Sequence, residues 1–264
     1  MPTTQAVILA RGLGTRMRRV EGGGVAHGIA VHAATGEHAI ATGQALSTAQ
    51  TVAAAGGAKG MMPIGVDAGR PFVEYLLSAL ADAGITDVVL VVPPDHAAIR
   101  AHFTEVAPPQ RVALRFAVQD QPRGTSDAVF SARDAVRNAP FLVVNSDNYY
   151  TPSALRTAAD LAGCGVGAFE ADALVRESGF EPERVLRYAL LDIADNGTLR
   201  GIREKPGADD PLATRAERWV SMNLWSFTPA IFDACARVLP SPRGELELQD
   251  AVTAAIRDLG VVFA

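Results

Sequence analysis

A glycine-rich turn near the start of the chain has the residue types that bind a polyphosphate. The buried run AVILA, at residues 6–10, is followed by Gly12, Gly14, Thr15 and Arg16. Glycines let backbone N–H groups surround phosphate oxygens, while an arginine can neutralise their charge in a bidentate contact. The turn lacks the lysine of a P-loop and the third glycine of a dinucleotide fingerprint. Taken alone, it is equally compatible with a tight connection between a strand and a helix.

Two aspartates stand where their carboxylates could face a ligand site. Asp147 follows the apolar run FLVV, and Asp250 lies near the start of the last predicted helix. Asp250 is off the apolar stripe of that helix, which contains Leu248, Val252 and Ile256, so its carboxylate is free to face a cleft. The alternative for Asp147 is that it caps a turn, as aspartate commonly does at a strand end.

The composition limits the classes of partner. With 264 residues, of which 48% are hydrophobic, the chain is long enough for one large α/β domain. Lys and Arg number 24 against 29 Asp and Glu, and the net charge of -5 gives no general attraction to nucleic acid or to an anionic membrane. Cys164 and Cys235 stand alone in apolar surroundings, and neither a charged leader nor a membrane-spanning apolar run is visible. We therefore expect a cytoplasmic protein with a local phosphate site.

Short apolar runs alternate with amphipathic stretches in the first half of the chain. Strands are predicted at residues 6–10, 87–92, 112–118 and 141–147, and helices between them at residues 71–84 and 126–138. This alternation is typical of a doubly wound, Rossmann-like α/β sheet. Because such sheets bind ligands beyond the carboxyl ends of their strands, the residues that follow these runs are candidates for one common site.

The second half changes character. Closely spaced strand-like segments at residues 165–171, 185–193, 198–204 and 219–227 predict an antiparallel extension of the same mixed sheet. One helix that opens at Thr228-Pro229 and another at residues 244–260 are predicted to follow. Residues 20–58 are rich in Gly and Ala and interrupt the pattern, which favours an insertion within a single domain that spans residues 1–264. We assign no role to the histidines of this insertion.

An ordered set of motifs resembles the sugar-1-phosphate nucleotidyltransferases, the glucose-1-phosphate thymidylyltransferase-like family. VILARGLGTRM resembles the family's opening signature, and RPFVEYLLSALADAGITDVVLVV its next helix and strand. Five more segments match in the family's order: KGMMPIG, VQDQPRGTSDA, FLVVNSDNYY, IREKP with SMNLWSF, and RGELELQD. The resemblance covers most of the chain and implies the nucleotide-diphospho-sugar transferase fold, with a sugar-binding antiparallel extension.

The resemblance implies roles for individual residues. Arg16, Lys59 and Lys205 would be catalytic, the first two through the triphosphate and Lys205 through the sugar phosphate. The nucleotide would be bound by Leu9, Ala10, Gly12, Gly14, Thr15, Gln119, Pro122, Gly124 and Thr125. The sugar phosphate would be bound by Asn148, Tyr188, Glu204, Lys205 and Asn223. Asp147 and Asp250 would bind Mg²⁺.

The implied reaction joins a nucleoside triphosphate to a sugar 1-phosphate, or to a sugar-like cyclitol phosphate, and releases pyrophosphate. The phosphate of the sugar would attack the α-phosphorus in line, so that positioning and charge stabilisation supply the catalysis and no general base is needed. Neither nucleic acid nor membrane is an expected partner. The base, the acceptor and any homo-oligomeric assembly stay open.

Several positions depart from the family pattern. Arg11 replaces a usual Gly or Ala, where it would either add a phosphate contact or obstruct the site, and Asn145 and Ser146 add bulk before Asp147. Asp127 stands in the base loop where a small or amide residue is usual. Two alternatives therefore stay open. One is a non-catalytic, nucleotide-sensing regulatory relative; the other is a GT-A type glycosyltransferase, although SDN supplies only one of the two carboxylates of an Asp-x-Asp motif.

Overall fold

The computed structural model describes residues 2–11, 50, 59–65, 69–185, 188–204, 206–207 and 209–264, and of Lys59 the backbone only. Three of the predicted site elements therefore lie outside the described residues. These are the glycine-rich turn with Gly12, Gly14, Thr15 and Arg16, the insertion at residues 20–58 apart from Gln50, and Lys205.

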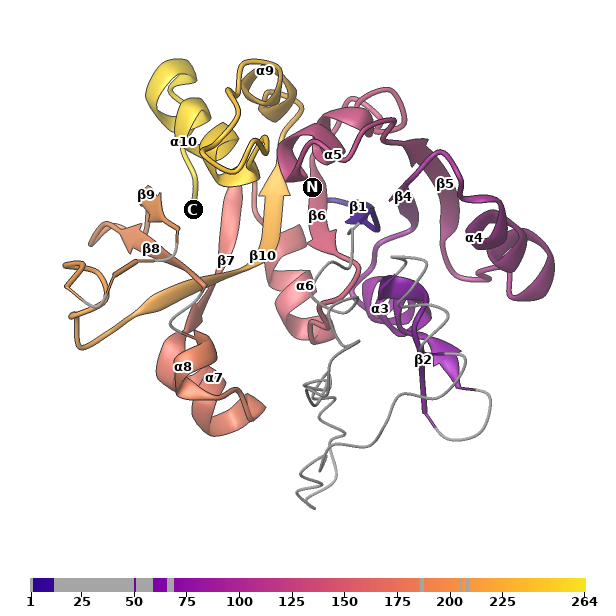
Figure 1. Cartoon of the computed structure of the whole chain (residues 1–264), viewed down its shortest axis with the longest axis horizontal. Coiled ribbons are helices and arrows are strands. Elements are labelled where there is room, and N and C mark those ends of the chain that lie inside the picture. The colour runs from indigo at the N-terminus through magenta and orange to yellow at the C-terminus, as the bar shows by residue number, and fades with distance from the viewer. Residues whose placement is uncertain are drawn as a thin grey trace.

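One mixed sheet organises the chain (Figure 1). Its strand order is β5-β4-β1-β6-β10-β8-β9, and β7 pairs with β10 beside this path. The strands are β1 (Gln5–Leu9), β4 (Asp87–Val92), β5 (Ala113–Val118), β6 (Phe141–Asn145), β7 (Gly165–Glu170), β8 (Ala189–Ile193), β9 (Leu199–Arg203) and β10 (Trp219–Phe227). A separate two-stranded ladder joins β2 (Pro63–Ile64) to β3 (Arg70–Pro71).

Strand β1 is the point from which the parallel part of the sheet winds both ways. It pairs in parallel with β4 on one side, where Leu9 lies opposite Val91, and with β6 on the other, where Leu9 lies opposite Asn145. Every residue of β1 and β4 is buried, as expected for central parallel strands with both faces covered. This topology confirms the predicted doubly wound sheet, and it directs the carboxyl ends of β1, β4, β5 and β6 to one edge.

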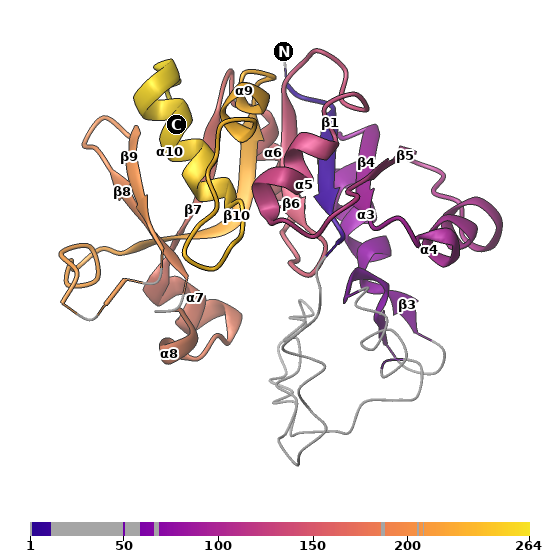
Figure 2. The ribbon, with the colours of Figure 1, turned by 45° about the horizontal axis from the view of Figure 1, so that its top comes forward.

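Strand β10 connects the parallel part to the antiparallel extension (Figure 2). Its second half pairs with β6, with Trp225 opposite Val143, while its first half pairs with β8, with Val220 opposite Leu190. Its pairing with β7 shifts register between Ser221 and Trp225. The predicted antiparallel extension is therefore confirmed, and it carries an irregularity close to Asn223.

Helices cover both faces of the sheet and form two cores. On one face, α3 (Phe72–Asp82), α6 (Pro152–Ala159) and α7 (Ala171–Ser178) pack with alternate β1 residues such as Ile8. The other face is covered by α5 (Thr125–Ser131), α9 (Ile231–Cys235) and α10 (Leu248–Leu259). These helices pack with the remaining β1 residues, which point to that face, such as Val7. Figure 1 shows these two groups of helices on opposite sides of the sheet. The shorter helical elements are η1 (Lys59–Met61), α4 (Ala97–Ala101), η2 (His102–Val106) and α8 (Pro182–Val185).

Three predicted boundaries are wrong. The helix predicted at 244–260 begins only at Leu248, because Glu247 before it has an extended backbone. Helix α5 ends at Ser131 instead of 138, because the chain beyond it closes tight turns in which the N–H groups of Ala132 and Arg133 bond to carbonyls three residues earlier. The strand predicted at 185–193 begins only at Ala189, since Val185 is the last residue of α8. In the described part of the chain, no helix is long and apolar enough to cross a membrane.

Candidate active site

The ends of β1 and β6 bring the start of the glycine-rich turn beside the aspartate turn. The backbone N–H of Ser146 donates to the carbonyl of Leu9 at 3.1 Å, and that of Ala10 donates to Val91 at 2.9 Å. Leu9 and Ala10, both predicted nucleotide contacts, therefore lie directly next to the segment that carries Asp147. The sheet itself holds these two predicted sites together.

The KGMMPIG segment packs against the same turn. A Cβ atom added at Gly60 would lie 2.9 Å from Cβ of Ser146 and 3.3 Å from its carbonyl oxygen, so only glycine leaves room for Ser146 here. The bulk that Ser146 adds to the family's usual pattern is thus accommodated by close packing on Gly60. This contact also places the backbone of Lys59 at the edge of the sheet near Asp147.

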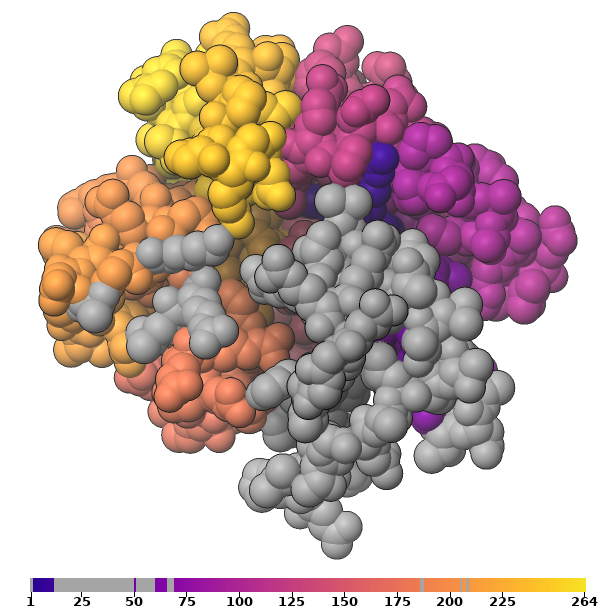
Figure 3. All heavy atoms as spheres, in the orientation of Figure 1, coloured from indigo at the N-terminus to yellow at the C-terminus, as the bar shows by residue number. Residues whose placement is uncertain are grey.

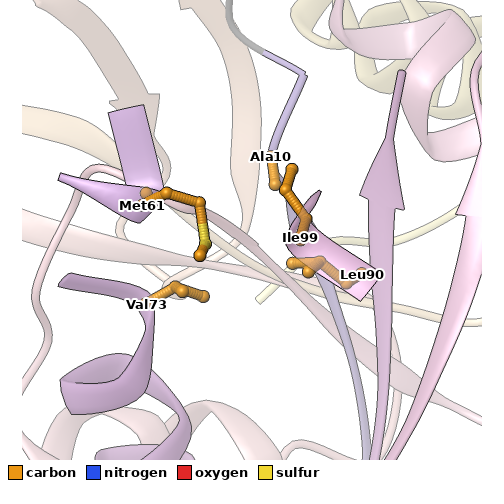
Figure 4. Close-up of a pocket in the computed structure, with 6 residues that line it drawn as sticks. Ala10, Met61, Val73, Leu90 and Ile99 are labelled. Carbon is orange, nitrogen blue, oxygen red and sulfur yellow. The ribbon is translucent and has the colours of Figure 1, made fainter. Parts of the chain in front are cut away.

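A small apolar cavity lies beneath Ala10 and Gly60 (Figure 4). Its volume is about 10 Å³, and Met61, Val73, Leu90 and Ile99 complete its wall. A space this small and apolar is a packing gap under the site and has no capacity for a substrate. A larger cavity of about 480 Å³ lies between α3 and η2, and none of the predicted site residues lines it.

Arg11 connects the end of β1 to the predicted base loop. Its guanidinium donates to the carbonyl of Gln119, and also to that of Asp120 at 3.1 Å. These carbonyls follow β5, so the side chain spans the end of β4, which lies between β1 and β5. In this structure Arg11 therefore fastens the base loop to the start of the glycine-rich turn.

Both the backbone and the side chain of Gln119 are hydrogen-bonded in the base loop. Its backbone N–H donates to the carbonyl of Val92 at 3.0 Å, which continues the ladder between β4 and β5. Its side-chain nitrogen donates to a carboxylate oxygen of Asp127 at 2.8 Å and to the carbonyl of Gly124 at 3.1 Å. Arg123 binds the second carboxylate oxygen of Asp127 at 2.6 Å. The amide of Gln119 is thus fixed by two acceptors, and only 1% of its surface is exposed.

The base loop docks on the segment that leads into α10. The N–H of Leu246 donates to Arg123 at 2.6 Å, and the N–H of Ser126 donates back to Leu246 at 2.9 Å. Gly124 has φ +121°, and a Cβ atom there would lie 2.4 Å from the carbonyl oxygen of Leu246. The hydroxyl of Thr125 accepts from the N–H of Leu248 at 2.9 Å. Figure 3 shows the C-terminal residues, in yellow, against the region of α5, in magenta.

Each predicted metal ligand has a neighbour in the chain whose side chain contacts β10. The amide nitrogen of Asn148, next to Asp147, donates to the carbonyl of Met222 at 2.8 Å. The amide nitrogen of Gln249, next to Asp250, donates to the side-chain oxygen of Asn223 at 3.4 Å. Since Met222 and Asn223 are consecutive, the turn of Asp147 and the helix of Asp250 meet at one point of the sheet.

Asn223 owes its position to the irregularity of β10. It has φ 59°, a left-handed conformation that asparagine tolerates better than most residues. The carbonyl of Met222 is bound by the buried hydroxyl of Tyr150 at 2.6 Å, as well as by Asn148. Burial raises the pKa of Tyr150, so its hydroxyl remains a donor. In the structure the amide nitrogen of Asn148 donates to the carbonyl of Met222. The predicted contact of Asn148 with the sugar phosphate stays a prediction.

The electrostatics of the first turn of α10 suit a cation. Burial, and secondarily the carboxylate of Glu247, raise the pKa of Asp250, so a bound cation would stabilise its ionised form. No cluster of three or more His, Cys, Asp or Glu in the described residues has a metal-binding arrangement. Two carboxylates without further protein ligands would not suit a structural zinc site, whereas Mg²⁺ can take its remaining ligands from water and phosphate. The metal role of Asp147 and Asp250 stays a prediction.

The predicted sugar-binding residues come from the antiparallel extension. The hydrogen bond with Glu247 raises the pKa of Arg243, and the charge of Glu204, the residue after β9, raises it further by less. Glu204 therefore lies near the entry to α10. Tyr188 is partly buried and packs edge-on against Phe180 at 6.1 Å between ring centroids. Pro122 is exposed in the base loop. The roles of these residues stay predictions.

Comparison with known proteins decides the family. A family model described as nucleotidyl transferase matches residues 54–263. The chain belongs to the nucleotidyl transferase family. A low-salt glycan biosynthesis nucleotidyltransferase of Haloferax volcanii is 27% identical over 202 residues, which cover 76% of this chain and 52% of the relative. A UTP–glucose-1-phosphate uridylyltransferase of the same organism is 28% identical over 203 residues, or 75% of each chain. The chain thus spans about half of the first relative and three quarters of the second.

A solved structure supports the fold of this nucleotidyl transferase family member. The crystal structure of a UDP-glucose pyrophosphorylase complexed with UDP-glucose superimposes with a TM-score of 0.68 and 16% sequence identity, covering 98% of this chain and 89% of the other. The predicted nucleotide-diphospho-sugar transferase fold is therefore confirmed.

Lysine usage is a signal that motif spacing did not capture. The chain has 22 arginines but only two lysines, Lys59 and Lys205, and both stand where the family motifs have lysine. All the other Lys or Arg positions of the chain are arginine. A position that needs only a positive charge would therefore be expected to contain arginine as well. A compact ammonium makes a point contact with phosphate, whereas the guanidinium is a planar fork. The pattern supports functional roles for both lysines without reference to their geometry.

Other features became visible only with the structure. Tyr149 is 51% exposed directly beside Asn148, and it is a further candidate to cover a sugar ring. Thr125 and Asp127 make contacts inside the base loop and to α10 that depend on residues more distant in the chain. Local spacing contains no signal for such contacts.

Proposed function

We propose that this protein is a sugar-1-phosphate nucleotidyltransferase, which condenses a nucleoside triphosphate with a sugar 1-phosphate or a sugar-like cyclitol phosphate. The observation that carries the proposal is the convergence of the family's motifs at one edge of the sheet. Contacts join Leu9 to Ser146, Gly60 to Ser146, and Asn223 to Gln249. The names of the relatives support the same reaction type, since both are nucleotidyl or uridylyl transferases.

Three parts of this edge of the sheet would bind the nucleotide. Arg16 and Lys59 would hold the triphosphate and offset the charge that opposes attack on the α-phosphorus. Gln119 and Gly124 would face the base, in the loop that Arg11 and α10 hold in place. Leu9 and Ala10 supply the backbone from which the glycine-rich turn departs.

The antiparallel extension of the sheet would bind the acceptor. Glu204 and Asn223 would hydrogen-bond hydroxyl groups of the sugar, and Lys205 would bind its phosphate. Asp147 and Asp250 would hold Mg²⁺, which supplies charge neutralisation on the phosphate oxygens when bound. The meeting of their two segments at Met222 and Asn223 supports this pairing.

The reaction forms one bond and breaks one. A phosphate oxygen of the acceptor would attack the α-phosphorus of the triphosphate, and the bond from that phosphorus to the bridging oxygen of pyrophosphate would break. A phosphate monoester is already ionised at neutral pH, so no side chain needs to remove a proton. The chain would therefore contribute alignment and electrostatic stabilisation. Because nucleoside triphosphates are cytoplasmic metabolites, we also propose a cytoplasmic location.

The direction of Arg11 bears on the regulatory alternative. A guanidinium that filled the phosphate site would favour a nucleotide-sensing relative without catalysis. In the structure this guanidinium binds the carbonyls of Gln119 and Asp120 in the base loop. Arg11 therefore gives no support to that alternative, and the catalytic proposal is favoured.

The decisive experiment measures pyrophosphate release with Mg²⁺, each common nucleoside triphosphate, and a panel of sugar and cyclitol phosphates. We expect release in at least one pairing, and near-complete loss in the Asp147→Asn and Asp250→Asn variants with the fold retained. Asp258→Asn is the matched control, because Asp258 lies on the same helix α10 but is paired with Arg257. Tight nucleotide binding without turnover across the panel would favour the regulator. Transfer of sugar from a preformed nucleotide sugar would favour the glycosyltransferase.

A further inference from the structure

We propose that Tyr150 is a positioning residue for the acceptor. Its buried hydroxyl holds the carbonyl of Met222, so that Asn148 can leave this carbonyl and bind the sugar phosphate. Tyr150 itself would touch no substrate. The inference rests on the proposed function, and it adds to the site a residue that acts through Asn148.

Strand β10 is interrupted where Met222 lies. It pairs with β7 up to Ser221 and again from Trp225, with β8 at Val220 and Ser221, and with β6 from Trp225 onward. In the described sheet, residues 222–224 therefore stand outside all three registers. Met222 is buried, and a buried carbonyl without a hydrogen-bond donor is unfavourable. The carbonyl of Met222 thus needs a donor from outside the ladder.

Two donors from the turn after Asp147 bind this carbonyl. The hydroxyl of Tyr150 donates to it at 2.6 Å, and the amide nitrogen of Asn148 donates to it at 2.8 Å. The same amide nitrogen also donates to the hydroxyl oxygen of Tyr150 at 3.1 Å. A carbonyl oxygen has two lone pairs, so both donors can bind at once, and either one is sufficient to satisfy it.

The two donors differ in their freedom to move. Tyr150 is 4% exposed, and it belongs to the core that α3 and α6 form with the sheet. Asn148 is half-buried and stands directly beside the exposed Tyr149. Rotation of its short side chain breaks two hydrogen bonds but displaces no core group. Asn148 is therefore the donor for which a ligand can compete, and Tyr150 is the donor that stays.

The irregular segment that Tyr150 holds also contains Asn223. This residue has φ 59°, its N–H donates to the hydroxyl of Ser221 at 3.2 Å, and its side-chain oxygen accepts from Gln249 at 3.4 Å. A left-handed backbone is costly for a residue with a Cβ atom, so the surrounding bonds must maintain it. Because Tyr150 keeps Met222 in place, Asn148 can turn without releasing Asn223. Both predicted sugar contacts are then available together.

The first test measures kcat and KM in Tyr150→Phe, which keeps the ring and removes the hydroxyl. Asn148 is then the remaining donor of the turn, so binding of the acceptor must leave the carbonyl of Met222 unpaired. We expect KM for the sugar phosphate to rise about tenfold, while KM for the nucleoside triphosphate stays within about twofold of the wild type. An unchanged KM for the sugar phosphate would overturn the proposal.

Tyr75→Phe is the matched control for loss of a tyrosine hydroxyl. Tyr75 is 40% exposed, and its hydroxyl donates to the carbonyl of Ile64 at 3.2 Å. This variant should leave kcat and both KM values unchanged. A rise in KM for the sugar phosphate equal to that of Tyr150→Phe would show an effect without specificity and would contradict the proposal.

A double-mutant cycle separates positioning from general support of the fold. In Asn148→Ala the acceptor has lost its contact, and Tyr150 binds Met222 in the free and the bound protein alike. Addition of Tyr150→Phe then leaves the carbonyl unpaired in both states, so KM for the sugar phosphate should rise by less than about twofold over that of Asn148→Ala. The same tenfold rise in both backgrounds would show that Tyr150 only supports the fold, and the proposal would be wrong.

Urea denaturation tests the shared carbonyl without reference to activity. Since either donor satisfies Met222, Tyr150→Phe and Asn148→Ala should each lower the urea midpoint slightly, and the double variant should lower it by clearly more than the sum of the two shifts. A double variant that fails to fold, while both single variants fold, is the extreme form of this result. Additive shifts would mean that the two side chains do not share the carbonyl, and they would overturn the proposal in an active or an inactive protein.

Failure of the proposed function is recognised separately. If the wild type releases pyrophosphate with no pairing, the function fails, and calorimetric titration with glucose 1-phosphate takes the place of KM. A Kd that rises about tenfold in Tyr150→Phe, but not when this change is added to Asn148→Ala, would support the role of Tyr150. The same Kd in all variants, or no binding to the wild type, would refute it.

Discussion

The hydroxyl oxygen of Thr125 accepts a hydrogen bond from the backbone N–H of Leu248 at 2.9 Å. Leu248 is the first residue of α10, and the side chain of its N-cap residue, Glu247, makes no capping bond. A residue of the predicted nucleotide site therefore caps the helix that carries Asp250. The base loop and the helix that carries the predicted metal ligand are therefore joined directly, although 123 residues separate the two partners.

Thr125→Val should test this connection, because valine keeps the shape of threonine and removes the acceptor. We expect the free energy of unfolding to fall by about 1 kcal/mol, as for loss of a helix cap. The Mg²⁺ concentration needed for half-maximal turnover should rise, because the first turn of α10 would be less firmly held. Urea denaturation and a Mg²⁺ titration measure the two effects. Thr125→Ser, which keeps the hydroxyl, should resemble the wild type in both; a Thr125→Val protein that does so too would show that the cap is unimportant.

Substitution of Arg11 should weaken nucleotide binding and leave the chemical step almost unchanged. Its guanidinium binds two successive carbonyls, of Gln119 and Asp120, which a lysine ammonium cannot reproduce as a fork. We expect Arg11→Ala and Arg11→Lys to raise KM for the nucleotide several-fold, by about 1 kcal/mol of lost binding, with little change in kcat. A phosphate contact would instead be largely preserved in Arg11→Lys. Steady-state kinetics of the two variants therefore distinguish a loop clamp from a phosphate ligand.

The positions of most strands along the chain and the doubly wound class could be predicted from the sequence, because both depend on local patterns. Buried runs such as 87–92 and polar groups at their ends follow from the composition of each segment. The end of α5 could not be predicted, since the helical spacing continues past Ser131. What stops the helix includes the hydroxyl of Ser131 bound to the carbonyl of Asp127, and the guanidinium of Arg115, on a neighbouring strand, bound to the carbonyl of Ala135.

The contacts inside the site were beyond sequence reasoning for the same physical reason. The sequence predicts that Arg11 either adds a phosphate contact or obstructs the site, whereas the structure shows its guanidinium bound to carbonyls that follow a strand two places away in the sheet. Asp127 departs from the family pattern, but its partner Gln119 becomes evident only when the loop is folded back on α5. Loops that close on each other place side chains by long-range geometry, which periodicity does not contain.

Cys235 should make the protein less stable in alkaline solution. Burial raises the pKa of its thiol to about 11, from an ordinary value of 9.0. As the pH rises through this window, the unfolded chain loses the thiol proton while the folded chain retains it. The free energy of unfolding should therefore fall by roughly 2 kcal/mol between these two pH values.

Urea denaturation across that pH range measures the effect of the thiol. Cys235→Ala should be less stable than the wild type at neutral pH, because the methylene and sulfur leave a small cavity, but its alkaline slope should be shallower. Cys164→Ala serves as the control for removal of a buried thiol, since Cys164 is the other buried free cysteine. An unchanged slope in Cys235→Ala would mean that other groups titrate in this window.

The scarcity of lysine allows the two predicted phosphate contacts to be examined one at a time. A reagent that acetylates amines can modify only Lys59, Lys205 and the terminal amine of this chain, and mass spectrometry resolves the three products. A nucleoside triphosphate with Mg²⁺ should protect Lys59, and a sugar 1-phosphate should protect Lys205. At ligand concentrations of about ten times Kd, each modification should slow roughly tenfold, because that fraction of sites is occupied. The terminal amine, which is not itself a predicted contact, reports the reactivity of the reagent in the same sample. Protection of Lys205 by the nucleotide alone would exchange the two assignments, and protection of neither lysine would remove both from the site.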